Sequence, residues 1–188
     1  MDGIECQLII DRLRIEDVVD YVVQGNTEQM RDDAFMAELK SWIRINDRQA
    51  VERRDGLSSR RSGNPSLPGW LSRRLLPLLL TEKSENTKYA KQIRSSAGLA
   101  VFCSARNDKP HWMLAGRAYQ RFALEATRMG LKHAFINQPV EVPTLRTQLA
   151  SFLGIGARRP DLMVRFGYGP SVPKSLRRTV DSVIIAAQ

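Results

Sequence analysis

Short apolar runs alternate with amphipathic helical patterns along the second half of the chain, and this alternation limits the possible folds more than any other feature. The run Ala97–Cys103 is apolar almost throughout, which is typical of a strand buried on both faces. Met113–Met129 then places its apolar residues on one face of a helix. Strands are also predicted over Lys132–Asn137 and Asp161–Tyr168, with a helix over Pro143–Gly154 between them. Helices that separate individual strands indicate a layered domain that mixes both elements.

The first part of the chain is predicted to be helical. A short helix is expected over Val18–Val23, and the sequence Gln24–Asn26 with its central glycine predicts a break after it. A second, amphipathic helix is expected over Glu28–Ile45, because its apolar residues recur at helical spacings. Near the other end of the chain, Val180–Ala187 is predicted as a fourth strand.

The positive charge is concentrated in two short windows. The chain has a net charge of +9, with 22 Arg and 7 Lys. Residues 53–74 contain six Arg and one Asp, and residues 158–178 contain five Arg, one Lys and one Asp, so each window carries +5 and the remaining chain −1. Guanidinium groups are good bidentate partners for phosphate. Because both windows are rich in Gly, Pro and Ser, they indicate loops that converge on one compact anion or on nothing.

The expected organisation is a single domain over residues 1–188. It has a helical N-terminal part (1–50), a long basic loop (53–74) and a core with a C-terminal basic segment (97–188). The Gly and Pro residues within Arg53–Trp70 predict the loop. Two interpretations of this loop are open: a lid over a bound ligand, or a surface loop that wraps a dimer, which we favour.

Composition excludes several classes of protein. The longest uninterrupted apolar stretch, Leu75–Leu80, has six residues, whereas a membrane helix needs about 20. The N-terminus has no basic leader, so we expect a cytoplasmic protein without a membrane partner. No metal site or disulfide framework is expected from two cysteines and two histidines, of which Cys103 is predicted to be a buried hydrophobe and His111 a hydrogen-bonded helix-start residue. No set of side chains for nucleophilic or hydrolytic catalysis is recognisable, so no catalytic residue is assigned.

The segment that follows the third predicted strand gathers groups that suit a phosphate. A Gly-rich turn is followed by Lys174, Ser175, Arg177 and Arg178. The cations supply charge-assisted hydrogen bonds to a dianion, and the hydroxyl supplies a neutral donor. A solvated basic turn is the alternative interpretation.

Several short motifs resemble the flavin-dependent nitroreductase family. In chain order they are FMAELKSWIR, RRDGLSSRRSGNPSLPGW, GRAYQRFALEATRMGL, HAFINQP, RFGYGP and PKSLRR. The block Ala97–Val183 resembles the C-terminal half of that family, and the upstream motifs are similar to its two-lobed bacterial branch, so that the chain resembles the C-terminal lobe of a two-lobed protein. The Arg-Ser-x-Arg phosphate motif that the family carries near its N-terminus has no counterpart in residues 1–20.

This resemblance implies an α+β fold, with a central mixed or antiparallel sheet flanked by helices, and FMN held at a homodimer interface. It also implies that NAD(P)H reduces FMN, which then reduces an electron-poor small-molecule acceptor. By position, the basic residues would bind the FMN phosphate, and Asn137 and Gln138 would lie beside the reactive nitrogen of the flavin, where a donor stabilises the reduced ring. The cofactor-binding residues that the resemblance implies are Asn137, Gln138, Lys174, Ser175, Arg177 and Arg178.

Three other interpretations are open. A flavin-sequestering or degenerate lobe would hold FMN with little turnover. A nucleic-acid binding module would use the Arg-Arg pairs of the basic windows, but these windows lack interleaved aromatic residues, so we do not expect nucleic acid as the partner. An interaction subunit would bind no small ligand.

Overall fold

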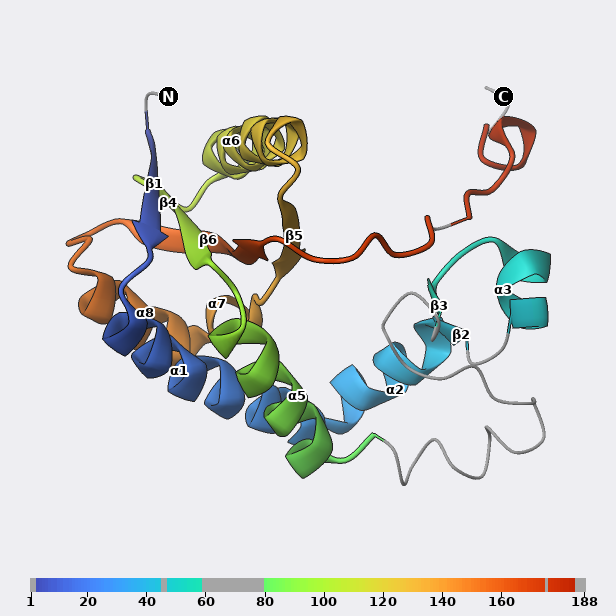
Figure 1. Ribbon diagram of the computed structural model, residues 1–188, viewed down its shortest axis with the longest axis horizontal. Coiled ribbons are helices and arrows are strands. Elements are labelled where there is room, and N and C mark those ends of the chain that lie inside the picture. Colours follow the sequence, from blue (N-terminus) through green and yellow to red (C-terminus); the bar gives the residue numbers. More distant parts are fainter. Residues whose placement is uncertain (1–2, 45–46, 59–79, 175, 185–188) are drawn as a thin grey trace. The chain divides into compact units, whose positions relative to one another are not determined.

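The structure is a computed structural model that describes residues 3–44, 47–58, 80–174 and 176–184 (Figure 1). The chain forms two compact units, which are described one at a time. Unit 1 comprises Met1–Arg31 and Glu82–Gly169, and unit 2 comprises Asp32–Thr81 and Pro170–Gln188. None of the helices within the described ranges is long and apolar enough to cross a membrane. The single domain over residues 1–188 stays a prediction.

A four-stranded antiparallel sheet forms the centre of unit 1. Its strands lie in the order β1 (Ile4–Ile9), β4 (Gly98–Ser104), β6 (Arg159–Gly167) and β5 (Lys132–Phe135), and each neighbouring pair is antiparallel. Every residue of β4 is buried, because this inner strand is covered on both faces. The three strands predicted in the second half of the chain are therefore confirmed, whereas β1 has no counterpart among the predictions.

Helices cover the two faces of the sheet unequally (Figure 1). One face, which we call the four-helix face, is covered by α1 (Arg12–Arg31), α5 (Glu82–Arg94), α7 (Gln138–Glu141) and α8 (Pro143–Leu153). The other, which we call the α6 face, is covered by α6 (Lys109–Arg128). The four-helix face buries mainly aliphatic side chains: Leu99, Val101 and Met163 of the sheet, with Val18, Val22, Ile93 and Leu149 of the helices.

α1 continues without interruption through Gln24–Asn26, so the predicted break there is wrong. Gly25 is buried in the helix because the backbone of Gln138 packs against it: a Cβ at this position would lie 2.8 Å from the Gln138 carbonyl carbon. Asn26 donates a hydrogen bond from Nδ2 to Oδ1 of Asn86 at 2.7 Å, which joins α1 to α5. Residues that are typical of a turn therefore serve helix packing here.

Local signals define the ends of α6 and α8, and both predicted helices are confirmed. Asp108 caps α6 by accepting a hydrogen bond from the backbone N–H of His111 at 3.0 Å. His111 Nδ1 lies 2.6 Å from Asp108 Oδ1, so the prediction of a hydrogen-bonded helix-start histidine is confirmed. Gly154 ends α8 in the left-handed conformation, with φ of 67°.

Unit 2 contains α2 (Asp33–Trp42), β2 (Ile43–Arg44), α3 (Asp47–Arg53), β3 (Leu57–Ser58) and the short 3-10 helix η1 (Val180–Ser182). β2 and β3 pair in parallel. α2 covers only the later part of the helix that was expected over residues 28–45. It begins anew because the side chain of Asp32 accepts hydrogen bonds from the backbone N–H groups of residues 34 and 35.

Two further predictions concern unit 2. The strand over Val180–Ala187 is wrong within the described residues, because Ser182 donates its backbone N–H and its hydroxyl to the carbonyl oxygen of Thr179 and so closes a turn. The predicted loop over Arg53–Trp70 lies mostly outside the described residues. In the part that is described, Arg53 ends α3 and a two-residue strand, β3, follows.

Candidate functional site

Asn137 lies between the end of β5 and the start of α7. Its Oδ1 accepts a hydrogen bond from the backbone N–H of Met163 at 2.8 Å, so the side chain fastens this junction to β6. The carboxamide oxygen is committed to the fold, and the amide NH₂ is the group that Asn137 can offer to a ligand.

Gln138 opens α7 and is buried, with 8% of its surface exposed. Its backbone packs against Gly25 of α1, and its Oε1 is buried without a hydrogen-bond partner. A buried carboxamide oxygen without a partner costs free energy, so such atoms in native proteins call for an explanation. The structure therefore places both residues of the predicted flavin-ring pair at one corner of unit 1, where α1, α7 and β6 meet.

Tyr89 of α5 and Arg165 of β6 complete this corner, and the sequence did not indicate either of them. Burial, and next the carboxylate of Glu85, raises the pKa of Tyr89, while Gln138 and Arg165 oppose that rise. Burial lowers the pKa of Arg165, and its Nε is buried without a hydrogen-bond partner. We call Tyr89, Asn137, Gln138 and Arg165 the polar corner. The only signal in the sequence is a lone arginine among the apolar residues of the strand predicted over Asp161–Tyr168.

The predicted phosphate-binding residues lie in unit 2. Lys174, Arg177 and Arg178 are exposed and lie after β6, where the described residues form neither helix nor strand; we call residues 174–178 the basic segment. Arg177 donates from Nη1 to the carbonyl oxygen of Leu176 at 3.3 Å. Ser175 lies outside the described residues. The polar corner and the basic segment belong to different units, so their union in one site stays a prediction.

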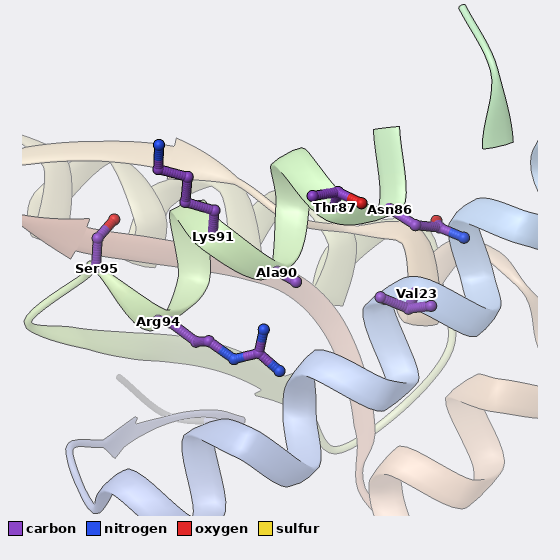
Figure 2. Close-up of a pocket in the computed structure, with 7 residues that line it drawn as sticks. All are labelled: Val23, Asn86, Thr87, Ala90, Lys91, Arg94 and Ser95. Carbon is purple, nitrogen blue, oxygen red and sulfur yellow. The ribbon is translucent and has the colours of Figure 1, made fainter. Parts of the chain in front are cut away.

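A surface groove runs between α1 and α5, with a volume of about 680 Å³ (Figure 2). Val23 and Ala90 supply its apolar surface. Its polar groups largely serve helix packing: Arg94 pairs with Glu16 of α1, and Asn86 donates from Nδ2 to the hydroxyl oxygen of Thr27 at 2.9 Å. Figure 2 shows Arg94 reaching toward α1 while Lys91 points away from it. Asn137 and Gln138, the predicted cofactor-binding residues of unit 1, do not line this groove.

Cys103 is the buried hydrophobic residue that the sequence predicts. Cys103 is fully buried in β4, and burial, with the nearby carboxylate of Glu5, raises its pKa to about 12. A thiol of this kind packs in the core as a small hydrophobic side chain and is not a nucleophile.

Comparison with known proteins gives a fold but no sequence family. No protein-family model matches the chain, and no curated protein does. The FMN-dependent nitroreductase NfnB from Mycobacterium smegmatis, in complex with NADPH, is 10% identical with a TM-score of 0.59, over 99% of this chain and 79% of that one. A BluB-like flavoprotein from Clostridium difficile 630 is 12% identical with a TM-score of 0.55, over 99% and 80%.

Iodotyrosine deiodinase, solved with FMN and 3-iodo-L-tyrosine, shares the same architecture. It is 10% identical with a TM-score of 0.54, over 99% of this chain and 76% of that one. The chain therefore has the nitroreductase fold, and the predicted fold class of an α+β protein with a helix-flanked antiparallel sheet is confirmed. The resemblance to one lobe of a two-lobed branch stays a prediction.

Proposed function

We propose that this protein binds FMN and acts as a nitroreductase-like oxidoreductase, which passes hydride from NAD(P)H through FMN to an electron-poor small molecule. The observation that carries the proposal is the likeness in fold, over 99% of this chain, to an FMN-dependent nitroreductase, a BluB-like flavoprotein and an FMN-bound deiodinase. Because one fold can serve many functions, the proposal also rests on the residues of the polar corner and the basic segment.

The residues present fit such a cofactor. The segment 174–178 contains three cations and no carboxylate, which suits a phosphate dianion. At the polar corner, Asn137 offers an amide donor and Gln138 has a carboxamide oxygen without a partner. The corner therefore has both a donor and an acceptor for the polar edge of a flavin ring. Bound FMN would supply the hydride chemistry, and the chain would supply position and electrostatics.

The proposed roles follow from this chemistry. Lys174, Arg177 and Arg178, with the Ser175 hydroxyl, hold the phosphate, and Asn137 with Gln138 orients the flavin ring. No side chain of the chain needs to act as an acid or base. We further propose a cytoplasmic homodimer, since the resemblance implies that FMN lies between two copies.

The first test is whether the purified protein takes up FMN. We expect a visible flavin absorbance band and saturable quenching of FMN fluorescence. No band and no quenching would refute the proposal. If FMN binds, rapid mixing with NADPH under anaerobic conditions should bleach the band, whereas a flavin-sequestering protein would hold it oxidised.

The basic segment gives the first prediction about single residues. Lys174→Ala and Arg177→Ala should each weaken FMN binding by about 1.5–3 kcal/mol, roughly 10- to 150-fold in Kd, because each removes a hydrogen bond to a charged group. Arg121→Ala, which removes an exposed arginine from α6, is the matched control and should bind FMN like the wild type. Unchanged affinity in both test variants would place the phosphate elsewhere. Fluorescence titration measures all three.

A further inference from the structure

A second group of charged residues lies at the start of β6, in unit 1. Arg158 and Arg159 enter the strand, Asp161 follows them within it, Arg146 comes from the first turn of α8, and Glu5 comes from β1. We call these five residues the arginine cluster. Arg158 and Arg159 lie in the same basic window of the sequence as the basic segment. The two groups are separated along the chain by strand β6.

The contacts within the arginine cluster leave one cation without a carboxylate. Arg158 Nε lies 3.3 Å from Glu5 Oε2, and Arg159 Nη1 pairs with Asp161 Oδ1. Arg146 instead donates from Nε to the carbonyl oxygen of Val140, and within the described part of the chain no carboxylate pairs with it. Three guanidinium groups therefore face two carboxylates.

Three polar atoms of the arginine cluster are buried and make no hydrogen bond. They are Nη1 of Arg158, Nε of Arg159 and Oδ2 of Asp161. The first two atoms are donors and the third is an acceptor. Since nearly all buried polar atoms in native proteins have a partner, this set calls for a group that accepts from two guanidinium N–H groups and donates to a carboxylate.

The electrostatics at this place also favour an added anion. Burial, and next the positive charge of Arg159, lowers the pKa of Arg146, and the carboxylate of Asp161 only partly opposes this, so two like charges are held close together in partly buried surroundings. An anion between them would relieve this repulsion. The Arg158 and Glu5 side chains are 39% and 42% exposed, whereas Asp161 is 6% exposed, so the arginine cluster extends from the surface of unit 1 to a buried carboxylate.

We propose that the arginine cluster binds a compact oxyanion that carries a proton, with free inorganic phosphate as the ligand. Its oxygens accept hydrogen bonds from Arg158 Nη1 and Arg159 Nε, and its P–OH group donates to Asp161 Oδ2. Sulfate has the same size and geometry but carries no proton near neutral pH. It would meet the bare Asp161 oxygen with a charged oxygen and be repelled.

Isothermal titration at about pH 8 and constant ionic strength tests the ligand. Inorganic phosphate, sulfate and methyl phosphate are compared, because a phosphomonoester loses its second proton near pH ~6 and then resembles sulfate. We expect saturable binding of phosphate, at least about tenfold tighter than of the other two anions. Absence of saturable phosphate binding, or equal affinity for all three anions, would overturn the proposal, and the unpaired atoms would then be satisfied by water.

Variants test the residues. Arg158→Gln and Arg146→Gln should each weaken phosphate binding about 10- to 100-fold, and Arg121→Gln on α6 should leave it unchanged. Asp161→Asn should abolish the preference for phosphate over sulfate, because a neutral amide repels neither anion. Unfolding midpoints without added anion show which variants are folded. If Asp161→Asn does not fold, the Arg158 and Arg146 variants decide, and wild-type phosphate affinity in both would overturn the site.

One control separates this site from the proposed FMN site. Lys174→Ala should bind phosphate like the wild type, and Arg158→Gln should bind FMN like the wild type. Loss of phosphate binding in the Lys174 variant instead would move the anion to the basic segment and overturn the proposal. Failure of FMN binding alone would leave the phosphate result standing.

Discussion

The two faces of the sheet in unit 1 are packed by different kinds of side chain. On the four-helix face, Leu99, Val101 and Met163 are completely buried under aliphatic side chains from four helices. On the α6 face, one helix supplies aromatic rings instead, with Phe102 packed edge-on against Tyr119 and Phe122 at centroid distances of 6.1 and 5.7 Å. The margins of this face stay open: Leu8 at one edge strand is 58% exposed and Phe135 at the other is 48% exposed.

The four-helix face therefore contributes most to the stability of unit 1, whereas the α6 face keeps exposed apolar surface. Burial of aliphatic side chains supplies most of the free energy of folding, and the four-helix face has the more complete burial. A single helix cannot cover four strands, so the α6 face keeps exposed apolar margins. The cost of substitutions should therefore depend on which face a side chain occupies, even between neighbours on one strand.

The two cysteines give the largest expected contrast. Cys103 points to the four-helix face, whereas Cys6 pairs with Phe102 and points to the α6 face. Burial raises the pKa of Cys103 to about 12, so its thiolate fraction at about pH 8 is roughly three orders of magnitude below that of an ordinary thiol. A thiol reagent should label Cys6 and spare Cys103 in the native protein, and label both in denaturant, as read by peptide mass spectrometry. Native labelling of Cys103 at the rate of Cys6 would show that the four-helix face opens readily.

A matched pair of leucine truncations compares the two faces in free energy. Leu149 of α8 is fully buried in the four-helix core, so Leu149→Ala should lower the free energy of unfolding by about 2–5 kcal/mol. Leu162 of β6 is only partly buried on the α6 face, so Leu162→Ala should cost clearly less. Chemical denaturation of both variants, with equal m-values, is the measurement. Equal losses would mean that the α6 face is as tightly packed as the other.

Sequence reasoning predicted the elements whose causes are local. The apolar run of β4, the helical period of α6 and the glycine that ends α8 all carry their signal within a few residues. It misread Gly25, because the reason for a glycine there is the backbone of Gln138, which only the folded chain brings to it. It missed β1 because the alternation of polar and apolar residues over Ile4–Leu8 is too short a pattern to be recognised.

The candidate site divides in the same way. The cation-rich segment from Lys174 to Arg178 can be recognised from composition, since charge and hydroxyl groups cluster within five residues. The polar corner cannot, because Tyr89 meets Gln138 and Arg165 only when the fold brings α5, α7 and β6 together. The pairing of Arg158 with Glu5 likewise requires β1, the strand that the sequence did not reveal.

The pH dependence of stability at His133 on β5 measures how well the α6 face excludes water. The imidazole packs against Tyr119 and Phe122, and burial lowers its pKa. Because the unfolded chain then holds the proton more tightly, this histidine contributes stability above the unfolded-state pKa of about 6.5, and the contribution is lost as the pH falls from that value through the lower folded-state pKa. The free energy of unfolding should drop less between about pH 8 and pH 5 in His133→Gln than in the wild type. The difference should be small because the ring is only partly buried, and identical pH profiles would mean that water reaches the ring freely.

Leu8 and Ile9 are neighbours on β1 but face opposite sides of the sheet. Substitution of Leu8 should have the smallest effect on stability of the changes predicted here. Leu8 faces the α6 side and is largely exposed, so Leu8→Ser should change the free energy of unfolding by less than about 0.5 kcal/mol. Ile9 faces the four-helix side with 2% exposure, so Ile9→Ser is the matched control and should destabilise strongly by burying a hydroxyl in place of an aliphatic side chain. Both variants keep the backbone pairing of β1 with β4, so any difference reports the side chains. A large loss in Leu8→Ser at high protein concentration would show that the margin of the α6 face is covered in solution, and disappearance of that loss on dilution would identify the cover as a second copy of the chain.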